Sequence, residues 1–259
     1  MSDGRDDFYI GYQADAPPAL ARWVRPRALG IALFALAIAP LLLVAQNPFS
    51  KAAFEFGTER TLNGVIALEP YPTLVVERPG GTADDDAPSV SRYLLVAFGK
   101  FGADELVRDH AGKSVDVTGT LVYRDDRTMI EVSSVTPRGD AAEVATAAAA
   151  EAPEPLGEHT YVGEIVDSKC FLGVMKPGNT KPHRACATRC ISGGIPPVLL
   201  VRDDEGRAAY LLLVGSDGRA VNAEVLDMVA EPLRITGAVE RLGDLLVLRA
   251  DPETYERIP

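Results

Sequence analysis

The 259-residue chain lacks the short motifs that mark the commonest classes of enzyme. It contains no G-x-S-x-G nucleophile elbow, no phosphate-binding P-loop, no dinucleotide-binding glycine fingerprint and no C-x-x-C-H haem-attachment site. Cysteine and histidine are also scarce, with three residues of each. These absences favour a protein that is not an enzyme, and they leave little material for redox or metal chemistry.

Positive charge is in short supply as well. The chain has 26 Lys and Arg against 37 Asp and Glu, which gives a formal net charge of -11. Residues 1–27 carry four Arg and four Asp, so all of the net negative charge lies in the remainder. An acidic domain is repelled by phosphate backbones and anionic lipid surfaces, which excludes nucleic acid as a partner.

Long apolar runs are rare too, and the chain has one near its N-terminus. Residues 28–45 are uncharged and almost wholly apolar, and the uncharged stretch continues to residue 49. This length can span a bilayer, so we expect a transmembrane helix at residues 28–49. A cleaved signal peptide is the alternative. The long preceding segment and the lack of an A-x-A cleavage site favour a retained anchor.

Basic residues indicate the orientation of this span. Arg22, Arg25 and Arg27 precede it, whereas Lys51 is the only nearby cation after it. The positive-inside rule therefore places the tail, residues 1–27, in the cytoplasm and the rest of the chain across the membrane.

The exported part divides into two halves with the same order of strand-like segments. The first half covers residues 54–137 and the second covers residues 158–259. Residues 138–157 between them are rich in Ala, Glu and Pro and cannot build a core, so we expect a linker there. Similar motifs recur at corresponding places: Y-L-L-V at 93–96 with Y-L-L-L at 210–213, and V-T-G-T-L at 117–121 with I-T-G-A-V at 235–239.

Each half has the pattern of a small barrel. Tight-turn sequences at residues 124–127 and 241–244 read as hairpin loops between long strands. Short helical stretches are expected around residues 103–109 and 223–229, between the middle and later strands. The pattern predicts a mostly β (α+β) fold with a transmembrane helix followed by two tandem OB-like barrels. Two sandwich-like sheets without closure are the alternative.

The segment from residue 167 to 197 holds all three cysteines and one histidine. Pro182 and Gly193-Gly194 predict a helix over about 182–192, which would place the residues of H-x-x-C-x-x-x-C on one face. Such thiolate and imidazole ligands suit a zinc or iron-containing centre. A nearby carboxylate, Asp167, is positioned to orient the imidazole. The candidate metal ligands are Cys170, His183, Cys186 and Cys190.

Two other interpretations of this segment stay open. Cys170 and either Cys186 or Cys190 could form a disulfide that fastens the loop to the helix. The thiols could instead carry out thiol exchange or metal transfer, with nearby Arg184 and Arg189 lowering a thiol pKa. The first half has no comparable insertion, so we expect only the second half to carry chemistry.

Several motifs along the chain together resemble those of a family of bacterial single-pass membrane-anchored proteins. They are F-Y-I-G-Y at 8–12, E-P-Y-P-T-L-V-V at 69–76 and the V-D-S-K-C…H-R-A-C-A-T-R-C segment at 166–190. The resemblance implies the bacterial inner membrane, with the main domains periplasmic. It also implies an association with membrane-bound respiratory oxidoreductases, including molybdopterin-dependent ones. It implies location and context rather than a mechanism.

Taken together, these observations predict a non-catalytic accessory subunit of a membrane-bound electron-transfer complex, with a protein partner in that complex. Its Cys/His cluster would bind a metal or metallocofactor. One alternative is a structural or assembly protein with a disulfide-stapled OB-like domain. A second alternative is a thiol redox or metal-transfer protein.

Overall fold

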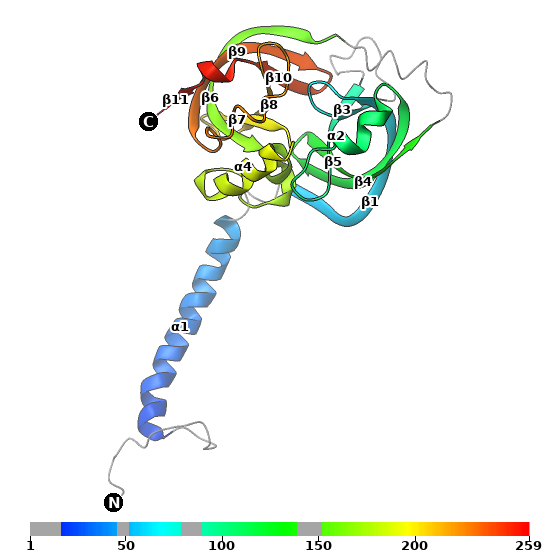
Figure 1. Ribbon diagram of the computed structural model, residues 1–259. Helices are drawn as coiled ribbons and strands as arrows, with labels where there is room; N and C mark the ends of the chain where they lie inside the picture. The colour runs from blue at the N-terminus through cyan, green and yellow to red at the C-terminus, as the bar shows by residue number, and fades with distance from the viewer. Residues whose placement is uncertain (1–16, 46–51, 79–89, 139–151, 259) are drawn as a thin grey trace, which may run out of the picture. The chain divides into compact units, whose positions relative to one another are not determined.

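The computed structural model describes residues 17–45, 52–78, 90–138 and 152–258 (Figure 1). The chain forms two compact units, Met1–Ser50 and Lys51–Pro259. The F-Y-I-G-Y segment at residues 8–12 lies outside the described residues, as does most of the predicted linker.

The first unit contains one long helix, α1, over Pro18–Ala45. Its most apolar 18-residue window has a mean hydropathy of 2.6, and it is the one helix among the described residues that is long and apolar enough to cross a membrane. The helix begins at Pro18, well before the predicted residue 28, so the arginine-containing segment before the apolar run is also helical. There, Arg27 donates a hydrogen bond to the carbonyl of Trp23 (2.8 Å) and stacks over its ring. The apolar pattern therefore predicts which part of the helix is suited to lipid, but it does not predict where the helix begins.

In the second unit, the first half folds into a closed five-stranded barrel. The strand order is β1-β2-β3-β5-β4, and β4 pairs back onto β1. β3 and β5 run parallel, whereas the other neighbours are antiparallel. The short helix α2 (Asp104–Val107) lies between β3 and β4 in the chain. The strands are β1 (Ala52–Ala67), β2 (Thr73–Glu77), β3 (Val90–Val96), β4 (Ser114–Arg124) and β5 (Arg127–Pro137).

The second half repeats this arrangement. Its strand order is β6-β7-β8-β10-β9, with β9 pairing back onto β6 and the short β11 added at the edge of β9. Both sheets close, so the predicted pair of OB-like barrels is confirmed and the open-sandwich alternative is wrong. The strands are β6 (Glu154–Asp167), β7 (Pro197–Arg202), β8 (Ala208–Val214), β9 (Pro232–Leu242), β10 (Leu245–Arg249) and β11 (Glu256–Arg257).

Local predictions for these barrels hold in most places. Both hairpin loops form, with Asp125 (φ 53°) and Gly243 (φ 60°) in the left-handed region that tight turns require. The helix expected around residues 223–229 is wrong, because that segment is a run of turns with one i→i+4 bond, from Val225 to Val221 (3.3 Å). The second barrel also starts earlier than residue 158: Glu154 already pairs with Arg241.

The two barrels pack against each other and are not separate domains joined only by a linker. Each has its own buried core, and a third apolar cluster contains buried residues of both barrels. Leu94 and Val96 of β3 enter this shared cluster, while their neighbour Leu95 faces the interior of the first barrel. β3 is therefore buried on both faces, which explains the consecutive apolar residues at its end, Tyr93–Val96. Cys170 and Cys190 belong to the same shared cluster.

Candidate metal centre

The predicted metal ligands lie in an insertion between β6 and β7 of the second barrel. β6 ends at Asp167, and a π turn over Cys170–Val174 follows, in which the Met175 N–H donates to the Cys170 carbonyl (3.1 Å). Such turns are rare and occur frequently at functional sites. A short 3₁₀ turn and helix α4 (Arg184–Ser192) come next, so the helix predicted over 182–192 is confirmed.

The end of α4 is joined to the first barrel. The Gly193 carbonyl accepts a hydrogen bond from the Gly102 N–H (2.9 Å). A Cβ at Gly193 would lie 1.9 Å from the Lys100 carbonyl oxygen, so only glycine allows this approach. The contact brings the loop that follows β3 against the cysteine-bearing helix, with Lys100 at the cluster.

The structure brings the four predicted ligands together in two overlapping groups. In the first, the ligand atoms of Cys170, His183 and Cys186 lie within 4.8 Å of one another. In the second, those of Cys170, Cys190 and Asp167 do so. Cys170 belongs to both groups, and no single group among the described residues holds all four predicted ligands. All three cysteines are free thiols.

The sulfur separation matches the edge of a metal tetrahedron better than a covalent bond. Two sulfurs bound to one zinc ion at about 2.3 Å lie about 3.8 Å apart in tetrahedral geometry. The Sγ atoms of Cys170 and Cys190 are 3.9 Å apart. A disulfide would need about 2.05 Å. The donor set of thiolates and an imidazole fits a thiophilic ion, and the site is enclosed: Cys170, Cys190 and His183 are all at most 4% exposed.

Asp167 holds both the π turn and the imidazole in place. Its carboxylate is fully buried, and one oxygen accepts the Cys170 backbone N–H (2.8 Å). The other oxygen lies 3.1 Å from Nε2 of His183. When Nε2–H donates to this carboxylate, Nδ1 keeps its lone pair for a ligand role. The structure therefore places Asp167 in contact with His183, as the predicted orienting role requires.

Lys100 completes the cluster from the first barrel. Its ammonium lies 2.7 Å from Sγ of Cys186 and 3.6 Å from Sγ of Cys190. The pKa of Lys100 is raised above its ordinary value, mainly because the hydrogen bond to Cys186 stabilises the charged form. The expectation that only the second half contributes chemistry is thus wrong. Lys100 lies in a short F-G-K-F-G loop that carries no sequence signal for a metal or redox role.

The thiols differ in their proton affinity. The pKa of Cys190 is lowered to about 7, first because the Cys170 thiol donates to its sulfur and further because Lys100 is near. The same hydrogen bond, together with burial, raises the pKa of Cys170. The two arginines expected to lower a thiol pKa are either paired with other groups or exposed. Arg184 pairs with Glu231 and the Asp227 carbonyl, and the Arg189 side chain is exposed.

A second lysine, Lys169, ties the insertion to the first barrel. It is 2% exposed, and its ammonium donates to the carbonyls of Ala97 (2.9 Å) and Gly99 (2.8 Å). It also forms an ion pair with Glu131. Lys169 stands beside Cys170 in the D-S-K-C motif, but sequence alone does not indicate that its charge is buried in the other barrel. Its three acceptors fix the turn that carries Cys170.

Comparisons with known proteins add little to this description. No protein-family model and no curated protein matches the chain. One solved structure that is similar is a deletion mutant of the single-stranded DNA binding protein from Thermus aquaticus, at 13% identity. The alignment covers 81% of this chain and 96% of that one, with a TM-score of 0.22, which is too low to support an argument about fold or function.

Proposed function

We propose that this protein is a membrane-anchored metal-binding protein, in which Cys170, His183, Cys186 and Cys190 hold one thiophilic ion on the non-cytoplasmic side. We further propose that it is a non-catalytic accessory subunit of a membrane-bound electron-transfer complex. The observation that carries the metal site is the buried donor set, in which the sulfurs of Cys170 and Cys190 lie at the spacing of a metal tetrahedron.

Charge supports the same assignment. Three thiolates and a neutral imidazole around a divalent ion carry a net charge of -1. The Lys100 ammonium, in contact with two of the sulfurs, offsets that charge inside a largely buried site. Asp167 supplies the carboxylate that commonly supports a metal-bound histidine.

The proposed set of four ligands argues for a non-catalytic role. Four protein ligands fill a tetrahedral ion and leave no position for a substrate or a water molecule. Such a centre stabilises the fold or, if the metal is iron, relays electrons. The membrane location is supported by α1 and by the arginines that precede its apolar part. Membership of an electron-transfer complex is supported by the motif resemblance.

The proposal predicts the composition of the protein as purified. Full-length protein extracted anaerobically in mild detergent is expected to contain about one metal ion per chain. All three thiols should become reactive after chelation and unfolding. An iron centre would show thiolate absorption in the visible range and change on reduction. Zinc would be colourless and redox-inert, which would overturn the electron relay and leave metal binding intact.

Thiol exchange is the second candidate, favoured by the 3.9 Å separation of Cys170 and Cys190. In that reaction the two thiols lose two electrons and two protons to a partner disulfide, which becomes two thiols. The same preparation distinguishes the candidates. A metal-free protein with a reversible Cys170–Cys190 disulfide would support exchange and contradict the metal centre. The deep burial of both sulfurs favours the metal.

Lys100 offers a sharper test of the charge argument. We expect Lys100→Met to weaken metal binding about 10–100-fold, as removing a supporting group beside a metal ligand commonly does. Competition with a chromophoric chelator measures this change. Lys113→Met is the matched control, because Lys113 is exposed and its ammonium bonds only the Asp109 carbonyl among the described residues. Equal affinities for the two variants would contradict a role for Lys100 at the metal.

A further inference from the structure

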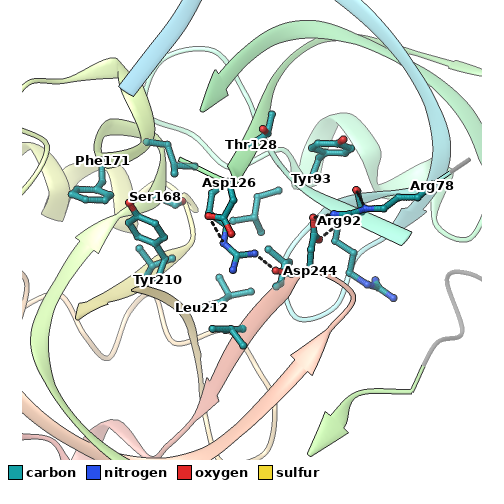
Figure 2. A pocket seen from close by; sticks show the side chains of 17 residues that line it. Arg78, Arg92, Tyr93, Asp126, Thr128, Ser168, Phe171, Tyr210, Leu212 and Asp244 are labelled. Carbon is teal, nitrogen blue, oxygen red and sulfur yellow. Dashed lines mark hydrogen bonds and ion pairs between the residues drawn. The ribbon is translucent and has the colours of Figure 1, made fainter. Parts of the chain in front are cut away.

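A second candidate site is lined by Ser168, Phe171 and Leu172, which are close to Cys170 in the chain. It is a cavity of about 120 Å³ between the two barrels. We call it the inter-barrel cavity. Figure 2 shows Ser168, Phe171 and Tyr210 on one side of it and Arg78, Arg92 and Asp244 on the other. A cavity of about 150 Å³ accepts benzene, so this smaller one has room for a molecule of at most about six non-hydrogen atoms.

Two buried donors in the inter-barrel cavity have no hydrogen-bond acceptor among the described residues. Among the described residues, the Ser168 hydroxyl and Nε of Arg127 make no hydrogen bond. Ser168 is 2% exposed. Buried polar groups nearly always have partners, so these two donors indicate an acceptor within the cavity. A hydroxyl and a guanidinium N–H that line the same cavity suit an anionic oxygen.

The arginine is held in position for this role. One terminal nitrogen of Arg127 donates to the backbone carbonyl of Asp244. Its Nε forms a long ion pair with Asp126 (3.6 Å), whose side chain is 76% exposed to solvent. The guanidinium therefore stays available to a stronger acceptor in the cavity.

The charge of the lining also favours an anion. Three arginines and two aspartates line the cavity, a formal charge of +1 in a chain of net charge -11. One of these aspartates, Asp244, is already satisfied: its oxygens accept the Arg92 backbone N–H (2.8 Å) and a nitrogen of Arg78 (3.1 Å). It joins the barrels and does not repel an anion as a free carboxylate would.

The rest of the wall is apolar. The rings of Phe171 and Tyr210 lie 5.2 Å apart, and the Tyr210 hydroxyl is already bonded to Asp125 (2.9 Å). An inorganic oxyanion would leave this surface without a partner. The aliphatic side chains of the wall belong to Leu94, Leu172, Val198, Leu212, Leu245 and Leu246.

We propose that the inter-barrel cavity binds a small carboxylate with a short aliphatic tail. The carboxylate accepts from Ser168 and Arg127, and the tail packs against the leucines and Phe171. A tail of about two or three carbons fits the volume. The site is separate from the metal centre, although Ser168 and Phe171 flank the Lys169-Cys170 pair in the chain.

Butyrate is the probe for this proposal, titrated calorimetrically into full-length protein in detergent, both metal-loaded and chelated. We expect saturable binding of butyrate, no binding of the neutral isostere butyramide, and much weaker binding of sulfate. Ser168→Ala should weaken butyrate about tenfold because a buried hydrogen bond to a charged group is lost. Ser192→Ala, at an exposed serine, should not change it.

Leu212→Phe places a larger side chain in the apolar wall of the inter-barrel cavity. It should abolish butyrate binding while thermal unfolding stays cooperative. Equal binding of butyramide and butyrate would overturn the anionic part of the proposal. Equal binding of sulfate would overturn the tail. If no probe saturates the protein, the cavity holds only water and the proposal fails, whatever the metal content of the same sample.

Discussion

Full-length protein carrying Cys170→Ser is expected to lose its bound metal. Cys170 is the one sulfur that belongs to both groups of potential ligands, and it is 4% exposed. Serine keeps the size of the side chain but replaces a thiolate with a hydroxyl, which is a poor ligand for a thiophilic ion. Affinity should fall more than about 100-fold, beyond the effect of changes to supporting groups. Metal analysis after gel filtration measures the loss.

The same variant should also be less stable. An ion that binds only the native state at about 1,000 times its Kd stabilises it by about 4 kcal/mol. For a folded unit of about 200 residues this corresponds to a Tm lower by about 8–16 °C. Chelator should lower the Tm of the natural protein by a similar amount and leave the variant unchanged.

Cys186→Ser provides an internal comparison. Cys186 is partly exposed and belongs to only one of the two groups, so its loss should weaken binding less than the loss of Cys170. Ser192→Ala on the same helix is the neutral control. Retention of a full equivalent of metal by the Cys170→Ser variant would rule out the proposed centre.

Lys169→Met is expected to cost the protein about 3–5 kcal/mol of unfolding free energy. The substitution keeps most of the buried hydrocarbon but leaves Glu131, only 12% exposed, without its ion pair, and two carbonyls without their donor. The Tm should fall by about 6–20 °C for a unit of this size. Urea unfolding followed by far-ultraviolet circular dichroism measures the change.

Two further variants separate the buried charge from a general effect of lysine loss. Adding Glu131→Gln to Lys169→Met removes the orphaned charge and should restore part of the stability. Lys181→Met, at an exposed position in the same insertion, should change stability by less than about 0.5 kcal/mol. A loss of unfolding free energy below about 1 kcal/mol for Lys169→Met would show that the ion pair does not stabilise the packing of the two barrels.

Much of the fold could be predicted from the sequence because it depends on local patterns. The strand runs, the hairpin loops and the helix between Pro182 and Gly193 all follow from periodicity and turn residues, and the internal duplication predicted two similar barrels. The run at 223–229 looked helical because it lies between strands like α2, yet it forms successive turns. Position in a repeat did not determine its local structure.

The contacts between the barrels could not be predicted in the same way. The apolar run at the end of β3 indicates a strand buried on both faces, but not what covers each face. Lys100 reaches the sulfurs only because Gly193 allows the two backbones to approach. Such a placement depends on how two domains pack, and no periodicity within either domain records it. The metal ligands were predictable because they lie within one short segment.

Four consecutive residues, from the last residue of β6 onward, contact different parts of the protein. Asp167 contacts His183, and Ser168 lines the inter-barrel cavity. Lys169 pairs with Glu131 of the first barrel, and Cys170 lies beside the sulfur of Cys190. A protein engineer who wished to graft this cluster onto another OB scaffold could not transfer the insertion alone. The graft would lack the ammonium of Lys100 and leave Lys169 without acceptors. The smallest transplantable unit is the pair of barrels.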